Sequence, residues 1–299
     1  ANDHNAYAWT LARAYVQADP REVEEEARSL LEALEATAPK DGWFTEMFCR
    51  RSRYIRPDNG ARIEAIREAI RDLAAPPDLE AVLLTSLLEA ADRVDSTTGV
   101  QMAFLKRWAP RALKPLELRM PELVEGRGVA LFGEASDAAA TEVDLVYLDP
   151  PYNQHSYLGN YHVWETLIRW DEPETYGVAC KRVDCRTLKS PFNRRGTIKQ
   201  ALQQILTRLR ARHVLVSFND EGFLTRAELE EMLAQHGEVR VLEVEAPRYV
   251  GARIGIHNPQ GERVGRVGRL KNREYLFFAS PDADAIQAVE RMAALRKVG

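Results

Sequence analysis

The chain has 299 residues, of which 45% are hydrophobic and 29% are charged, and its formal net charge is −4. The composition is ordinary for a globular protein, the length allows one large domain or two modest ones, and the acidic balance argues against a protein that coats nucleic acid. Because no apolar run reaches the roughly 18 residues of a membrane span and the N-terminus lacks a signal pattern, we expect no membrane association and a cytoplasmic location.

The first 121 residues are predicted to be mostly helical. Asn2 and Asp3 lie just ahead of an apolar stripe with helical spacing, where a carboxylate caps free backbone N–H groups. In nucleotide-binding α/β folds, an acid at the end of a strand instead accepts hydrogen bonds from ribose hydroxyls. Gly42–Gly60 is predicted to be a loop, in which aromatic residues are interleaved with arginines. Two further helical stripes follow, over 63–73 and 82–94.

The three cysteines are Cys49, Cys180 and Cys185, an odd number without the paired spacing of a zinc site. Free thiols in a reducing compartment are the favoured interpretation, with a zinc site as the less favoured alternative. We therefore expect no metal.

A turn that follows an apolar strand organises the second half of the chain. A short strand over 129–132 ends in residues 133–137, and a nearly continuous apolar run over 143–148 then stops at Asp149, Pro150, Pro151 and Tyr152. Such a run is typical of a buried parallel strand, and the two prolines force a turn at its carboxyl end. Because ligands of open α/β sheets bind outside these ends, Asp149 and Tyr152 are predicted to lie in a cleft.

The remaining elements alternate between helices and strands. Helices are predicted over 157–167 and 198–212, and a strand over 213–220; Thr225 and Glu228 form a capping box at the start of another helix. Strands over 239–244 and 274–279 and a final helix complete the chain. This order predicts an α/β fold with a doubly wound sheet.

Basic residues concentrate in two downstream segments. Residues 181–199 and 248–273 each hold seven Lys or Arg against a single acid, whereas 17–36 is strongly acidic. The first segment lacks helical periodicity and is predicted to be a mobile loop. Each segment alone is equally consistent with a solvated loop, but together they favour a localised surface for a polyanion.

The string DPPY at Asp149–Tyr152 resembles the catalytic motif of amino-methylating DNA methyltransferases. With the helical region and the flanking strands, the chain from Asn2 to Ala279 resembles the Dam-like adenine-specific (N6) DNA methyltransferases of the alpha motif order. The resemblance implies a Rossmann-like S-adenosylmethionine-dependent methyltransferase sheet with an inserted helical subdomain. Residues 1–18 and 122–299 would form the catalytic domain, and residues 19–121 the target-recognition region, or otherwise a helical lid on the sheet.

The resemblance also implies roles for single residues. Asp149 and the carbonyl of Pro150 or Pro151 would accept hydrogen bonds from the N6 amine of an adenine flipped out of duplex DNA, and Tyr152 would stack on the base. S-adenosylmethionine would be the methyl donor, with Asp3 on its ribose and Asp137 near its adenine. The cations expected to contact DNA are Lys181, Arg182, Arg186, Arg194 and Arg195. Transfer would be direct and would need no metal.

One motif of the resembled family is missing. No FxGxG, the glycine-rich signature that wraps the cofactor, occurs in the 299 residues. We therefore expect that a preceding segment or a separate polypeptide completes the cofactor site. DPPY also serves cytosine-N4 and RNA-adenine methylation, and a non-catalytic DNA-binding remnant is a further alternative. A restriction–modification setting is what the resemblance suggests.

Overall fold

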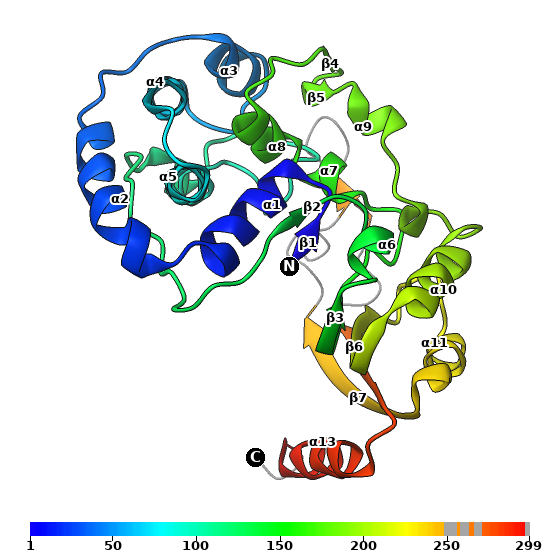
Figure 1. Ribbon diagram of the computed structural model, residues 1–299. Helices are drawn as coiled ribbons and strands as arrows, with labels where there is room; N and C mark the ends of the chain where they lie inside the picture. Colours follow the sequence, from blue (N-terminus) through cyan, green and yellow to red (C-terminus); the bar gives the residue numbers. More distant parts are fainter. Residues whose placement is uncertain (248–255, 258–262, 266–270, 297–299) are drawn as a thin grey trace. The chain divides into compact units, whose positions relative to one another are not determined.

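The computed structural model describes residues 1–247, 256–257, 263–265 and 271–296, and the chain divides into two compact units (Figure 1). The first unit comprises residues 1–134 and 157–188, and the second comprises residues 135–156 and 189–299. The α-helices and strands described in the first unit are β1 (Asn2–Asp3), α1 (Ala6–Ala12), α2 (Pro20–Glu35), α3 (Trp43–Thr45), α4 (Pro57–Leu73), α5 (Pro77–Arg93), β2 (Leu131–Phe132), α7 (Tyr157–Asn160), α8 (His162–Arg169), β4 (Thr175–Tyr176), β5 (Lys181–Arg182) and α9 (Asp184–Thr187).

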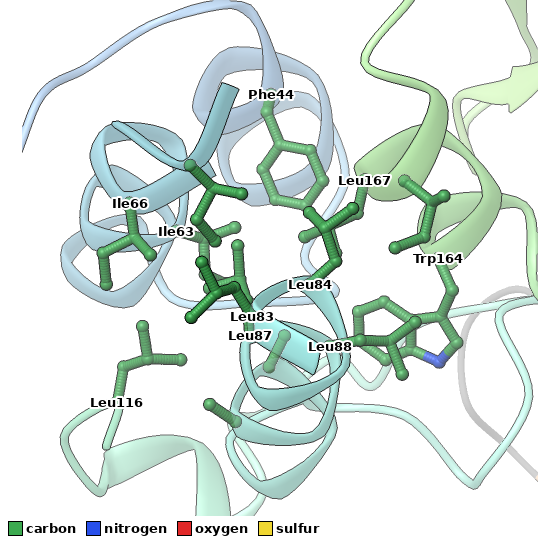
Figure 2. Close-up of a cluster of buried hydrophobic side chains, with 14 of the residues drawn as sticks. Phe44, Ile63, Ile66, Leu83, Leu84, Leu87, Leu88, Leu116, Trp164 and Leu167 are labelled. Atoms are coloured by element: carbon green, nitrogen blue, oxygen red, sulfur yellow. The ribbon is translucent and has the colours of Figure 1, made fainter. Parts of the chain in front are cut away.

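The core of the first unit forms around α5. Its leucines, spaced three and four residues apart, are buried, and so are apolar residues of α4 and α8 (Figure 2). Phe44 from α3 and Leu116 from the segment after α5 join the same cluster. The stripes predicted over 63–73 and 82–94 therefore correspond to real helices, because each buries its apolar side against a neighbour.

The segment predicted as a loop over Gly42–Gly60 is largely helical. It contains α3, a π-helical stretch over Glu46–Arg51 and the first turn of α4. Phe44, Phe48 and Tyr54 are fully buried. The prediction was wrong because arginines at the surface interrupt the buried aromatic residues. The apolar pattern of the helices is therefore too short to recognise in the sequence.

The second unit contains a mixed four-stranded sheet in the order β3-β6-β10-β7. Strands β3 and β6 are parallel, with Leu148 opposite Val216, and β10 is antiparallel to both β6 and β7. The described elements of this unit are α6 (Ala135–Ala138), β3 (Glu142–Leu148), α10 (Ile198–Arg208), β6 (Arg210–Asn219), α11 (Arg226–Leu233), β7 (Glu238–Pro247), β8 (Ile256–His257), β9 (Arg263–Gly265), β10 (Lys271–Ser280) and α13 (Ala283–Arg296). The α/β class predicted from the sequence is confirmed at this level.

Helices α10 and α11 build the core of the second unit on β6 and β10. Val214, Val216 and Phe218 alternate along β6 and are buried, together with Phe277 of β10 and Leu202 of α10. This alternation is the period-two pattern of a sheet with one face covered by helices. Helices α10 and α11 therefore pack on the face of the strands whose ends form the candidate site.

Strand β3 differs from its predicted environment. It pairs with β6 on one side and is the first strand of the sheet, and Val143, Leu145 and Tyr147 are each at least 40% exposed. The strand was predicted correctly, but its complete burial was wrong. A continuous apolar run shows only that a strand could be buried on both faces. How much of its surface is buried depends on the strands and helices that lie beside it.

The compact units are not divided at residues 18 and 121, the boundaries expected for the catalytic and target-recognition parts. Residues 19–121 share the first unit with 1–18 and 122–134. Their predicted role in DNA recognition stays a proposal. Within the described ranges of the chain, no helix combines the length and apolarity that crossing a membrane requires.

The capping box at α11 provides a test of the second unit's stability. Thr225 Oγ1 accepts from Glu228 N at 3.3 Å, and Glu228 accepts from Thr225 N at 3.0 Å. Replacing Thr225 with Ala is expected to lower the free energy of unfolding by about 1 kcal/mol, measured by urea denaturation. The control is Thr207→Ala, because Thr207 is exposed inside α10 and its hydroxyl bonds only within that helix. Equal losses in both variants would contradict the capping role.

Candidate active site

The DPPY turn begins where β3 ends. Leu148 is the last residue of β3, and Asp149 follows directly beside the carboxyl end of the parallel strand β6. The Tyr152 ring lies 5.5 Å from the Phe218 ring, and the Tyr152 carbonyl accepts from Phe223 N at 2.8 Å. These contacts hold the turn against the sheet, with Asp149 reaching the surface.

Two further polar residues accompany the turn and were not found from the sequence. Asn219 is the last residue of β6 and pairs with Glu274 of β10; its Nδ2 lies 3.5 Å from Glu274 Oε1. Asn219 carried a weak signal, since it ends a predicted strand. No signal in the sequence pointed to Glu274, because it reaches this end of the sheet only through the antiparallel pairing of β10 with β6.

The acidic groups around the turn have raised pKa values. Asp149 reaches the surface, and burial of the rest of its side chain raises its pKa. Burial also raises the pKa of Glu274, and the Asp149 charge contributes to that shift. Burial, followed by the charges of Glu274, Asp149 and Glu221, raises the pKa of Tyr152 to about 12. The site therefore combines an acceptor of raised basicity with a neutral aromatic ring, which suits an uncharged planar donor.

The basic segment after residue 189 contacts the same turn. Asn193 Nδ2 donates to the carbonyls of Asn153 at 2.9 Å and His155 at 3.0 Å, so the chain after Tyr152 is held in place. The Arg195 guanidinium lies over the Phe223 ring at 5.2 Å, and Arg194 is exposed. The predicted mobile loop thus contains ordered contacts, and two of its predicted DNA-contacting cations lie at the surface near the DPPY turn.

Asp3 lies at the carboxyl end of a second pair of parallel strands. It is opposite Phe132 in the β1–β2 pair, and its Oδ1 accepts from Asn5 N at 2.7 Å and Asn5 Nδ2 at 2.9 Å. The α1 amide of Tyr7 is bound by Glu165 instead. Asp3 therefore shapes the turn before α1 without capping the helix itself, and its Oδ2 has no hydrogen-bond partner within the described ranges.

Asp137 lies on α6 in the second unit. Its side chain is 81% exposed and lies 3.9 Å from Arg208. A carboxylate this exposed is available to a ligand, although such a weak surface ion pair does not fix its orientation.

The cations in the first unit differ sharply in environment. Arg186 is exposed, with its guanidinium 3.7 Å from the centre of the Tyr176 ring. Lys181 Nζ lies 3.3 Å from the Met102 sulfur. The Arg182 side chain is only 1% exposed and forms ion pairs with Asp171 at 2.7 Å and Asp184 at 2.8 Å. The prediction that Arg182 contacts DNA is therefore wrong, since both of its faces are used inside the protein.

The part of the chain that the structure describes contains no group of three His, Cys, Asp or Glu side chains able to hold a metal ion. All three cysteines are free and buried. Burial raises the pKa of each thiol, which disfavours the thiolate form.

The structure thus places a carboxylate and an aromatic ring on a turn at the carboxyl end of a parallel strand, the edge where α/β proteins bind ligands. The family model for D12 class N6 adenine-specific DNA methyltransferases matches residues 1–232. The chain belongs to this family, as the DPPY motif predicted.

Individual relatives agree with the family. The chain is 33% identical to type II methyltransferase M.FokI of Planomicrobium okeanokoites over 198 residues, which are 64% of this chain and 30% of that protein. It is 28% identical to M.NlaIII of Neisseria lactamica over 261 residues, 83% of this chain and 76% of the relative. M.CviAII of Paramecium bursaria Chlorella virus 1 is 28% identical over 264 residues, 84% and 75% of the two chains. The match therefore spans about three quarters of two relatives but less than a third of M.FokI. No solved structure matches the chain.

Proposed function

We propose that the chain transfers a methyl group to the N6 amine of adenine in a specific sequence of duplex DNA. The observation that carries the proposal is the DPPY turn at the end of β3, in a chain that belongs to an adenine-specific family. The relatives are type II methyltransferases, so a modification role within a restriction–modification system is part of the proposal.

The mechanism follows from the residues at the turn. Adenine N6 cannot be reached inside the duplex, so the base is flipped out and enters the edge of the sheet. Asp149 and the Pro150 or Pro151 carbonyl accept the two amine hydrogens, which directs the nitrogen lone pair away from them. Tyr152 stacks on the base. Catalysis is then mainly positioning and electrostatic stabilisation of charge that develops on N6.

The residues proposed to hold the methyl donor suit a nucleoside. S-adenosylmethionine, when bound, supplies a methyl group activated by a positively charged sulfur. Asp3 would accept hydrogen bonds from ribose hydroxyls through Oδ2, whose counterpart Oδ1 is already bound by Asn5. Asp137 would lie near the adenine. We also propose a Rossmann-like sheet and, because FxGxG is missing from the 299 residues, a glycine-rich cofactor loop supplied by a preceding segment or a separate polypeptide.

The direct test measures methyl transfer from labelled S-adenosylmethionine to unmethylated duplex DNA, followed by separation of the nucleosides. Label in N6-methyladenine is the expected result. Label in N4-methylcytosine, or transfer to RNA only, would replace the proposal with the corresponding alternative. Binding of DNA with no transfer, even after a glycine-rich segment from a relative is supplied, would favour a non-catalytic DNA-binding protein.

The pKa shifts at the turn give an expected pH dependence. Protonated Asp149 presents a donor to the amine, so activity should fall as pH decreases through the Asp149 pKa. Because burial raises that pKa, the acid limb of kcat/KM is expected above pH ~3.9, the ordinary value for Asp. An acid limb at or below that value would contradict a partly buried Asp149 carboxylate as the acceptor.

A further inference from the structure

A loop in the first unit is closed at its base by a buried aspartate. Asp95 is 2% exposed, and its carboxylate accepts from Thr97 Oγ1 at 2.6 Å and from the Arg111 guanidinium. Arg111 also donates through Nε to the Asp95 carbonyl at 3.0 Å. Ser96 N donates to the Tyr54 carbonyl at 2.7 Å. The two ends of the segment 96–111 are therefore joined to each other and to the helical core.

The interior of this loop is fixed as well. Gln101 is 2% exposed; its N donates to the Asn160 carbonyl at 2.6 Å, and its Oε1 accepts from Val163 N at 2.8 Å. Ser96 accepts from Leu105 N at 3.2 Å and from Ala109 N at 3.0 Å. A loop with this many internal hydrogen bonds loses little conformational entropy when it binds a partner.

An arginine from a neighbouring segment holds the part of the loop between Leu105 and Ala109. Arg53 donates to the Lys106 carbonyl at 2.7 Å, and its guanidinium lies 4.5 Å from the centre of the Trp108 ring. The hydrogen bond from Arg53 thus fixes the backbone of Lys106, while the Lys106 and Arg107 side chains are exposed. Arg53 adds its own charge to this part of the loop.

The charges of Lys106 and Arg107 are not neutralised by any residue that the structure describes. No carboxylate in the described ranges forms an ion pair with Lys106 or Arg107, whereas nearby arginines in the sequence are paired: Arg50 with Asp41, Arg51 with Glu46, and Arg56 with Asp58. Positive charge is therefore left concentrated on a pre-ordered loop of an acidic protein.

We propose that the loop 96–111 is a rigid arm that binds the phosphates of duplex DNA through Lys106 and Arg107. The inference rests on the proposed function and deepens it by naming a DNA-binding surface outside the cations predicted from the sequence. Phosphate contacts position a protein on the duplex and carry no sequence information by themselves. The arm accordingly sets the orientation of bound DNA and leaves base recognition to other residues.

The test is the salt dependence of binding to a nonspecific duplex, followed by fluorescence anisotropy, for the wild type and the variant Lys106→Gln/Arg107→Gln. Loss of two phosphate contacts should reduce the slope of log Kobs against log salt by about 2. Between 50 and 200 mM salt, the wild type should then lose roughly tenfold more affinity than the variant. The matched control is Lys40→Gln/Arg71→Gln, since these exposed cations are already paired with Glu68 and Asp72. Its slope should equal that of the wild type.

The outcomes separate this inference from the proposed function. An unchanged slope in the Lys106/Arg107 variant, an equal change in the control, or no DNA binding by the wild type would overturn the inference. A wild type that binds DNA but transfers no methyl group, with the slope change confined to the Lys106/Arg107 variant, would support the arm and overturn the proposed function. Thermal unfolding of both variants checks that the exchanges of exposed side chains leave the fold intact.

Discussion

Replacing Asp149 with Ala is expected to reduce methyl transfer by about 10³-fold or more, because the substitution removes the acceptor that orients the adenine amine. The residue follows β3 directly, and the turn is held by Tyr152 and its contacts with Phe218 and Phe223. None of those contacts uses the Asp149 side chain. The loss should therefore appear in kcat, with the melting temperature and DNA affinity close to those of the wild type.

A second substitution separates charge from shape. Asparagine keeps the size of Asp149 but replaces one acceptor oxygen with a donor, so Asp149→Asn should also be strongly impaired. The matched control is Asp144→Asn, because Asp144 lies on the same strand, is exposed and forms no hydrogen bond or ion pair with any residue that the structure describes. Transfer activity in Asp149→Ala within tenfold of the wild type would exclude the proposed role of this carboxylate.

The sequence predicted this site because the DPPY turn is local. An apolar strand, two prolines and a polar residue at a strand end are all encoded within ten consecutive residues, and local rules place Asp149 and Tyr152 just after the strand, where the structure has them. Glu274 reaches the same edge only through the pairing of β10 with β6, which joins residues far apart in the chain. Strand order is a tertiary property, so no local pattern identifies Glu274 as a neighbour of Asp149.

Burial was the least predictable property for a similar reason. Tyr54 and Phe48, interleaved with arginines, are core residues, whereas Leu145 in a continuous apolar run is 49% exposed on an edge strand. Composition near a residue gives its average environment, but packing partners fix the actual one. Arg182 is the clearest case, since it lies in a basic segment and is nevertheless almost fully buried.

The buried position of Arg182 predicts a stability effect that a DNA contact would not produce. Its guanidinium donates to both oxygens of Asp171 at 2.7 Å and to Asp184 at 2.8 Å, while Asp184 also lies 3.1 Å from Arg169. Replacing Arg182 with Ala leaves two partly buried carboxylates beside each other with less opposing charge. The free energy of unfolding is expected to fall by about 3 kcal/mol. This value is at the lower end for breaking a buried ion pair, because both acids keep some contact with water.

The contrast with Arg186 makes this expectation specific. Arg186 is exposed and contacts Tyr176, so Arg186→Ala should change stability by less than about 1 kcal/mol and weaken DNA binding instead. Urea denaturation and DNA titration of both variants give four values. If Arg182→Ala unfolds at the wild-type midpoint and loses DNA affinity, the ion-pair network is dispensable and the original prediction of a DNA contact is restored. If Arg182→Met recovers much of the lost stability, the penalty arises from the cavity left by the alanine, because methionine fills the space without restoring charge.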